Sequence, residues 1–281
     1  MAVFYNQATL SYNDNVINSN IVTGEIVDVL TASKTATLDT YTIGDEITYI
    51  ISIVNAGAAE FTELTIIDNL GEYAFGAGSV VPLTYVDGSV RYFADGVLQA
   101  APTVTDENPL TITGITVPAN GNAVIIYKAR VNSFAPPDGS ITNGAVISGN
   151  RLTPVTVSTT VTSDDALGLT ITKAVTPEVV SENGQLTYTF TITNTGSVPA
   201  VATDNLVVTD TFDPVLDITA VSFNGIAWSE PAEYTYNETT GEFATVAGQI
   251  TVPAAAYSQN PATGEWIVTP GVSVLRVTGT I

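Results

Sequence analysis

The side chains best suited to chemistry in this sequence are two lysines at equivalent positions. The chain has 281 residues and only three lysines, and each of Lys34 and Lys173 lies in an apolar run that predicts a first β-strand. A lysine in such a strand needs a partner, because an unpaired buried charge is costly. Asp68 and Asp210, which each close a later strand, are the expected partners. The alternative is that the lysine head groups reach the surface.

Most catalytic chemistry is excluded by residue type. The chain has no Cys and no His, which removes disulfides, zinc thiolate sites, Cys nucleophiles and Ser-His-Asp triads. Carboxylates are plentiful, but no spacing singles out a catalytic pair. We therefore expect no enzyme activity and no cofactor. The acidic residues between Asp204 and Asp217 form either a calcium-binding loop or a solvated one, and without a D-x-D-x-D-G run we expect no metal.

Composition and charge narrow the set of partners. Hydrophobic residues make up 45% of the chain, which is enough to form hydrophobic cores. Charged residues make up only 12%, so the surface must be rich in Thr, Ser, Asn and Gly. A net charge of −21 argues against nucleic acid and anionic membranes as partners. No apolar run approaches the roughly 20 residues of a membrane span. The first residues lack the basic and apolar regions of a signal peptide, so we expect none.

The sequence predicts strands throughout. Two runs are rich in residues that favour β-strands, and the second alternates between polar and apolar side chains: Thr48–Val54 and Thr187–Thr193. Turn signals such as Asp95-Gly96 and Asn224-Gly225 separate such runs. No segment longer than about ten residues keeps a helical period. Short strands at regular spacing favour an all-β fold of two tandem Ig-like antiparallel β-sandwiches.

Two copies of one repeat organise the chain. The matched segments of the first part share one offset of 139 residues (173 − 34), and later matches follow after short insertions. They are Lys34 with Lys173, Ile47-Thr-Tyr49 with Leu186-Thr-Tyr188, Asn55-Ala-Gly57 with Asn194-Thr-Gly196, Leu64–Asp68 with Leu206–Asp210, Ile115–Ala119 with Ile250–Ala254, and Gly121–Val131 with Gly271–Ile281.

These motifs carry a resemblance. Lys, then Gly-Asp-x-[IL]-Thr-Tyr, then Asn-x-Gly, then a strand that ends in Asp, resembles the conserved-repeat-domain family (domain of unknown function eleven) of Gram-positive surface proteins. The resemblance covers nearly the whole chain, twice, and implies Ig-like sandwiches in envelope or spore-surface proteins. The size and the two repeats are similar to those of the major subunits of clostridial spore appendages. An LPxTG-type C-terminus is absent from the sequence, so we do not expect that form of wall attachment.

The resemblance also implies a sharper role for the lysines. Some Ig-like domains of Gram-positive surface proteins join a first-strand Lys to a last-strand Asn by an amide, with a nearby acid promoting the reaction. Candidates here are Lys34 with Asn143, assisted by Asp68. The second repeat offers Lys173 and Asp210, with Asn6 of a neighbouring chain as the partner. An ordinary ion pair with Asp68 or Asp210 remains the alternative.

The segment Asn6–Asn13 resembles Asn143–Asn150, which follows the first repeat as its last strand. The second repeat stops at Ile281, where we expect its last strand to be missing. We therefore expect residues 1–24 to be a donor strand and linker, 25–163 a complete repeat, and 164–281 an incomplete one. The expected donor face is Phe4, Asn6, Ala8, Leu10 and Tyr12, and the expected acceptor edge is Val272, Val274, Arg276, Thr278 and Thr280.

Two functions follow as hypotheses. The first is a structural subunit that polymerises with itself, head to tail, into a filament or appendage on a spore or cell surface, by donor-strand complementation. Other surface or appendage proteins are further candidate partners. The second is a surface adhesin or binding module that does not polymerise. The donor strand separates them, since a free-standing adhesin should carry complete repeats.

Overall fold

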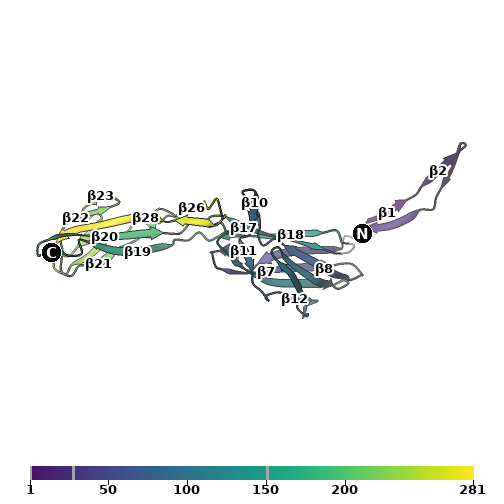
Figure 1. Cartoon of the computed structure of the whole chain (residues 1–281), viewed down its shortest axis with the longest axis horizontal. Coiled ribbons are helices and arrows are strands. Elements are labelled where there is room, and N and C mark those ends of the chain that lie inside the picture. The colour runs from purple at the N-terminus through teal and green to yellow at the C-terminus, as the bar shows by residue number, and fades with distance from the viewer. Residues whose placement is uncertain (1, 27–28, 150–151) are drawn as a thin grey trace. The chain divides into compact units, whose positions relative to one another are not determined.

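The computed structural model describes residues 2–26, 29–149 and 152–281, and it is all-β and antiparallel (Figure 1). In these ranges the single helical segment is one 3-10 turn, Ala202–Asp204. The chain divides into two units, Met1–Thr162 and Ser163–Ile281. None of the described helical segments is long and apolar enough to cross a membrane.

Unit 1 contains a sandwich of two six-stranded sheets. Their inward faces share one core, in which Tyr49, Ile66 and Tyr127 are fully buried. One sheet runs β13 (Val97–Leu98), β12 (Arg91–Ala94), β16 (Asn122–Val131), β7 (Glu46–Asn55) and β5 (Leu30–Ala36), with β11 (Leu83–Tyr85) also on β16. The other runs β14 (Thr103–Glu107), β15 (Leu110–Val117), β8 (Phe61–Asp68), β17 (Ser140–Ser148), β18 (Val155–Ser163) and β6 (Thr40–Tyr41). A small hairpin, β9 (Tyr73–Phe75) and β10 (Gly78–Val80), is attached.

Unit 2 is a smaller sandwich with a separate core around Phe212, Phe243 and Leu275. Its larger sheet runs β19 (Leu169–Thr176), β20 (Gln185–Asn194), β28 (Gly271–Thr280), β22 (Asp217–Phe223) and β23 (Ile226–Trp228). Its smaller sheet runs β21 (Thr209–Thr211), β25 (Glu242–Thr245) and β24 (Tyr234–Tyr236), and β26 (Ala256–Gln259) pairs with β27 (Trp266–Thr269).

The predicted strands and turns agree with the structure. The alternating run Thr187–Thr193 lies within β20, where Leu186, Phe190 and Ile192 face the core. The Asn224-Gly225 turn has positive φ at both residues, which the hairpin between β22 and β23 requires. The all-β fold of two tandem Ig-like sandwiches is therefore confirmed.

The asparagine of the Asn-x-Gly motif in each repeat holds the loop that follows it by hydrogen bonds. The Asn55 amide donates to the carbonyls of Ala59 and Pro118, both at 2.8 Å, and its Oδ1 accepts from Gly57 N at 2.9 Å. Asn194 makes the equivalent bonds in unit 2. Both side chains are buried, so the motif is structural, because a buried amide must have its hydrogen-bonding groups satisfied.

The first residues form a hairpin where the sequence indicated one strand and a linker. β1 (Ala2–Asn6) pairs with β4 (Val22–Ile26), and β2 (Thr9–Tyr12) pairs with β3 (Asn15–Asn18). Within the described residues these four strands pair only with one another. Phe4 and Leu10 on these strands are therefore exposed.

Candidate functional site

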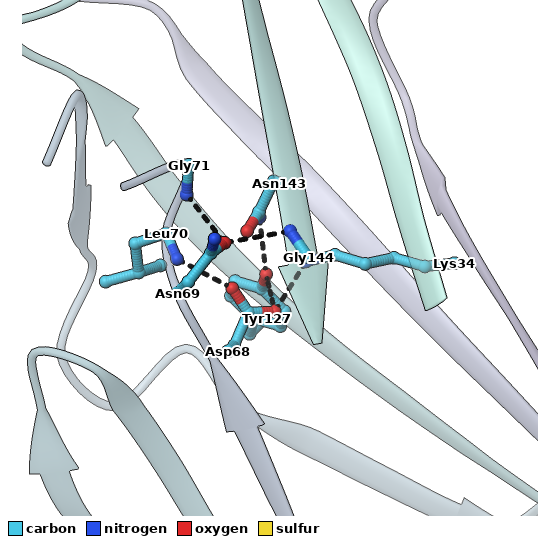
Figure 2. Close-up of polar contacts among 8 residues, drawn as sticks. All are labelled: Lys34, Asp68, Asn69, Leu70, Gly71, Tyr127, Asn143 and Gly144. Atoms are coloured by element: carbon cyan, nitrogen blue, oxygen red, sulfur yellow. Dashed lines mark hydrogen bonds and ion pairs between the residues drawn. The ribbon is translucent and has the colours of Figure 1, made fainter. Parts of the chain in front are cut away.

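The lysine that both repeats carry in the first strand forms a fully buried ion pair in unit 1. Nζ of Lys34 on β5 lies 2.6 Å from Oδ2 of Asp68, the last residue of β8, and both side chains are 0% exposed (Figure 2). The two strands belong to opposite sheets, so the pair crosses the core. Asp68 Oδ1 accepts from the Leu70 backbone N–H at 3.0 Å, so both carboxylate oxygens have partners.

Asn143 on β17 joins this cluster through a tyrosine. The Tyr127 hydroxyl donates to Asp68 Oδ2 at 2.5 Å and accepts from the Asn143 amide at 2.9 Å. Asn143 Oδ1 is buried, and no hydrogen bond to it is found among the described residues. The structure therefore brings together the three residues that the sequence singled out in the first repeat: Lys34, Asp68 and Asn143 (Figure 2).

Burial controls the electrostatics of the cluster. Desolvation lowers the pKa of Lys34 to about 8, although Asp68 acts in the opposite direction. Desolvation and Asp68 together hold the pKa of Tyr127 well above its ordinary value, so its hydroxyl remains a donor. Tyr49 stacks on Tyr127 at 5.4 Å between ring centroids, and both rings lie near the Lys34 ammonium.

Sequence comparison of the repeats missed Tyr127. The match of Gly121–Val131 to Gly271–Ile281 places Val277 at the equivalent position, so the repeats gave no signal for a tyrosine here. A second missed residue is Asn69, whose Oδ1 accepts from Gly144 N at 2.8 Å and Gly71 N at 3.1 Å. It ties β17 to the end of β8 beside the site (Figure 2).

The equivalent site in unit 2 is open. Lys173 forms an ion pair with Asp210, but its side chain is 40% exposed and that of Asp210 is 17% exposed. The lysine lies over the rings of Tyr188 and Phe212, without a tyrosine hydroxyl in the position of Tyr127. Asn6, the predicted third member, lies on β1 opposite Val22.

The lysine site is buried in unit 1 and exposed in unit 2 because the two units differ in the number of strands in one sheet. In unit 1 the order β14-β15-β8 continues into β17, β18 and β6, whereas the equivalent order β24-β25-β21 in unit 2 ends at β21 among the described residues. The strand that covers Lys34 thus has no counterpart beside Lys173 in the part of the chain that the structure describes. The inward-facing Ile171 on β19, paired with Ile192, is consequently 53% exposed.

One predicted assignment is wrong. The residues expected at the acceptor edge, Val272, Val274, Arg276, Thr278 and Thr280, lie on β28, which is hydrogen-bonded to β20 on one side and β22 on the other. Its backbone is therefore not free to accept a strand. In unit 1 the chain crosses after β16 to the opposite sheet, so β17 pairs with β8 and not with its predecessor. Among the described residues, β21 is an edge strand of the smaller sheet of unit 2 and corresponds to β8 of unit 1.

An apolar groove runs along this edge strand. It has a volume of about 170 Å³ and lies between β19 and the segment before β21. Its lining includes Ile171, Ile192, Leu206, Val208 and Ile250. Among the described residues, no group of three or more acidic side chains comes together to hold a metal ion.

The fold and the site define an all-β protein of two tandem Ig-like sandwiches, one with a closed Lys–Asp–Asn cluster and one with an open lysine site. No family model and no curated protein matches the chain.

Solved structures that match the chain at low similarity include pilins, collagen-binding domains and a family 123 glycoside hydrolase of Clostridium perfringens. The pilus backbone RrgB of Streptococcus pneumoniae matches at 14% identity and a TM-score of 0.35, over 86% of this chain and 54% of that chain. The 35 kDa C-terminal fragment of the major pilin GBS80 of Streptococcus agalactiae matches at 12% and 0.34, over 90% and 79%. The collagen-binding domain of a Staphylococcus aureus adhesin matches at 14% and 0.30, over 50% and 99%. The chain spans about half the length of the first of these. Identities this low leave the function to be argued from the chain's own residues.

Proposed function

We propose that this protein is a non-catalytic structural subunit that assembles head to tail into a filament on a spore or cell surface. A strand from the N-terminal segment of one copy completes unit 2 of the next. The observation that carries the proposal is the smaller sheet of unit 2, which ends at β21 among the described residues and leaves Ile171 on the facing sheet 53% exposed. An unpaired edge beside an apolar groove favours addition of a strand.

The occupant is identified by its residues. Asn6, Ala8 and Leu10 repeat Asn143, Ala145 and Ile147 of β17, all three of which are buried in unit 1. The donor residues are exposed in their own hairpin, so they are available to a second copy. Because donor and acceptor are different surfaces, each added copy presents a new acceptor, and the chain of subunits stays open unless it closes into a ring.

The register of the donated strand follows from unit 1. There β17 pairs with β8 so that Ala145 lies opposite Asp68 and Ile147 opposite Ile66. Transferred to the equivalent positions, Ala8 lies opposite Asp210 and Leu10 opposite Val208. Leu10 then enters the groove lined by Val208 and Ile171, and Asn6 takes the place of Asn143 near Lys173.

Two substitutions with the same charge test the proposal. Leu10→Asp places a carboxylate on the inserted face, whereas Ser11→Asp places it on the opposite face of the same strand. We expect filaments of the Ser11→Asp protein in negative-stain microscopy and monomers of Leu10→Asp in size-exclusion chromatography with light scattering. Filaments from both variants, or monomers of the unmodified protein, would overturn the proposal, and the monomers would favour the adhesin.

We also propose that the closed site in unit 1 locks that sandwich covalently. The Lys34 ammonium gives a proton to Asp68, and the neutral amine attacks Cγ of Asn143. A new C–N bond forms and the Asn143 C–N bond breaks: the protonated acid gives its proton to the departing nitrogen, which leaves as ammonia, and the carboxylate then takes a proton from the attacking nitrogen. A lysine pKa of about 8 supports this step, because roughly a tenth of the amine is neutral at pH 7.

A further inference from the structure

The first part of the N-terminal hairpin, β1 with β4, has the same register as the hairpin that closes unit 1. In β1 and β4, Phe4 lies opposite Gly24 and Asn6 opposite Val22. In β17 and β18, Ile141 lies opposite Val161 and Asn143 opposite Thr159. Both strands of the first hairpin map onto the second with one offset of 137 residues (141 − 4 and 161 − 24). The equivalence therefore includes β4 as well as β1.

The connection that follows each hairpin is also equivalent. After β18 ends at Ser163, β19 begins at Leu169, and after β4 ends at Ile26, β5 begins at Leu30. The second connection is two residues shorter. The N-terminal hairpin thus precedes the sandwich of unit 1 in the chain as the β17–β18 hairpin precedes that of unit 2.

The hairpin alone lacks a core. Two-stranded hairpins are marginally stable in water, and three or more strands with a buried face are needed for independent stability. Apolar side chains of both halves are at least half exposed: Phe4, Leu10, Ile17, Ile21 and Val22. The Phe4 ring lies against Gly24, where an added Cβ would meet it at 2.2 Å. This pair occupies the register position of Ile141 and Val161, both of which are buried in unit 1.

Unit 2 offers a place for the second strand too. In unit 1, β18 is followed in the sheet by β6, and the backbone N–H of Thr162 donates to the Asp39 carbonyl at 3.0 Å. The repeat offset of 139 makes Glu178 the equivalent of Asp39. The neighbouring Val179 is 87% exposed, and no β-strand is assigned to it among the described residues.

We propose that the donor is the whole hairpin and that the acceptor of a second copy has two parts. The first half, β1 and β2, pairs with β21, and β4 pairs with the segment Glu178–Val180. The order β24-β25-β21 is thereby extended as β14-β15-β8 is extended by β17, β18 and β6. This inference rests on the proposed function and deepens it. The tip of the hairpin adjusts on docking, because Thr9 lies opposite Asn18 in the free hairpin, one residue short of the register of unit 1.

Paired cysteines test the two halves separately, in a full chain that has no cysteine of its own. Thr9→Cys with Thr209→Cys reports on the first half, because the equivalent Val146 and Ile67 lie opposite each other. Glu25→Cys with Glu178→Cys reports on the second, from the equivalent Thr162 and Asp39. Thr9→Cys with Thr211→Cys is the control for a register slipped by two residues.

We expect both pairs to give ladders of disulfide-linked multimers on non-reducing gels after mild oxidation, and the control pair to give monomers. Ladders from the first pair alone would mean a single-stranded donor, which overturns this inference and leaves the proposed function intact. Filaments without a ladder from the second pair, or a ladder from the control, would likewise overturn it. An absence of both filaments and ladders would overturn the proposed function itself.

Discussion

Lys34 and Lys173 occupy the same position of the repeat, yet the Lys34 side chain is fully buried and that of Lys173 is not. Both pair with the aspartate at the end of the equivalent strand, Asp68 or Asp210. The difference lies in the neighbouring strand, which in unit 1 brings Asn143 and a cover over the ion pair. The two sites therefore represent a closed and an open form of one arrangement.

The closed site leads to a prediction about mass. We expect the purified protein to be lighter than its sequence by one ammonia, because Lys34 and Asn143 form one amide. Lys34→Met and Asn143→Ala should each restore the sequence mass. Lys128→Met, at an exposed lysine paired with Glu46, is the control and should keep the loss. Intact-mass spectrometry of monomers is the measurement, and an unmodified wild-type mass would leave only the ion pair.

The Tyr127 hydroxyl is predicted to position the cluster. Tyr127→Phe removes the donor to Asp68 Oδ2 and the acceptor for Asn143, leaving buried polar atoms with fewer partners. We expect the free energy of unfolding to fall by about 1–3 kcal/mol and amide formation to slow. Tyr188→Phe is the matched control, since no hydrogen bond of its hydroxyl is found among the described residues. Equal effects of the two variants in denaturant titration would contradict the prediction.

The repeat and the position of each lysine beside an aspartate of its own repeat were predictable, because they depend on local alternation and on matching residues. The hydroxyl of Tyr127 was not, since Val277 occupies its place in the other repeat. The free edge was misplaced on β28 for a different reason. Adjacency in sequence favours pairing with the preceding strand, but a sandwich requires a strand such as β17 to cross to the opposite sheet.

Stability should depend on pH through Lys34. Its folded pKa of about 8 lies below the value of 10.5 for a free lysine, so between these values the unfolded chain binds more protons. The free energy of unfolding should therefore rise from pH 8 to pH 10, by on the order of 2 kcal/mol. Above pH 10 the raised pKa values of Tyr49 and Tyr127 oppose the rise, because the unfolded tyrosines ionise first.

This pH effect is best measured in Asn143→Ala, where no amide can form and Lys34 stays free. The comparison is Asn143→Ala with Lys34→Met added, which removes the titrating amine beside Asp68. Denaturant titrations at pH 8, 9 and 10 should give a steeper rise for the single variant. If the free energy of unfolding rises equally with pH in both variants, the pKa of Lys34 is not lowered in the folded protein and the prediction is wrong.

A charged side chain in the apolar groove of unit 2 is predicted to weaken filament assembly. Ile171→Asp places a carboxylate where Leu10 of the next copy docks, and burying it unpaired should weaken assembly roughly 100-fold, about 3 kcal/mol. Thr172→Asp has the same charge on the outward face of β19, opposite Thr191, and should assemble normally. Critical concentrations from light scattering measure both. The prediction fails if the two variants have the same critical concentration.

The last prediction concerns Asn6, which the donated hairpin places at the position of Asn143. Beside Lys173 and Asp210, it meets the same three groups that unit 1 assembles around Lys34. Docking also covers Lys173, and this desolvation favours the neutral amine needed for attack on the Asn6 amide. We expect wild-type filaments to resist boiling in detergent. Asn6→Ala and Lys173→Met should still assemble but dissociate to monomers under those conditions. Tyr5→Ala, on the opposite face of β1, should retain the resistance.

Resistant filaments from Asn6→Ala would place the cross-link elsewhere. Wild-type filaments that dissociate would mean that the lack of a Tyr127 counterpart in unit 2 leaves the contact non-covalent.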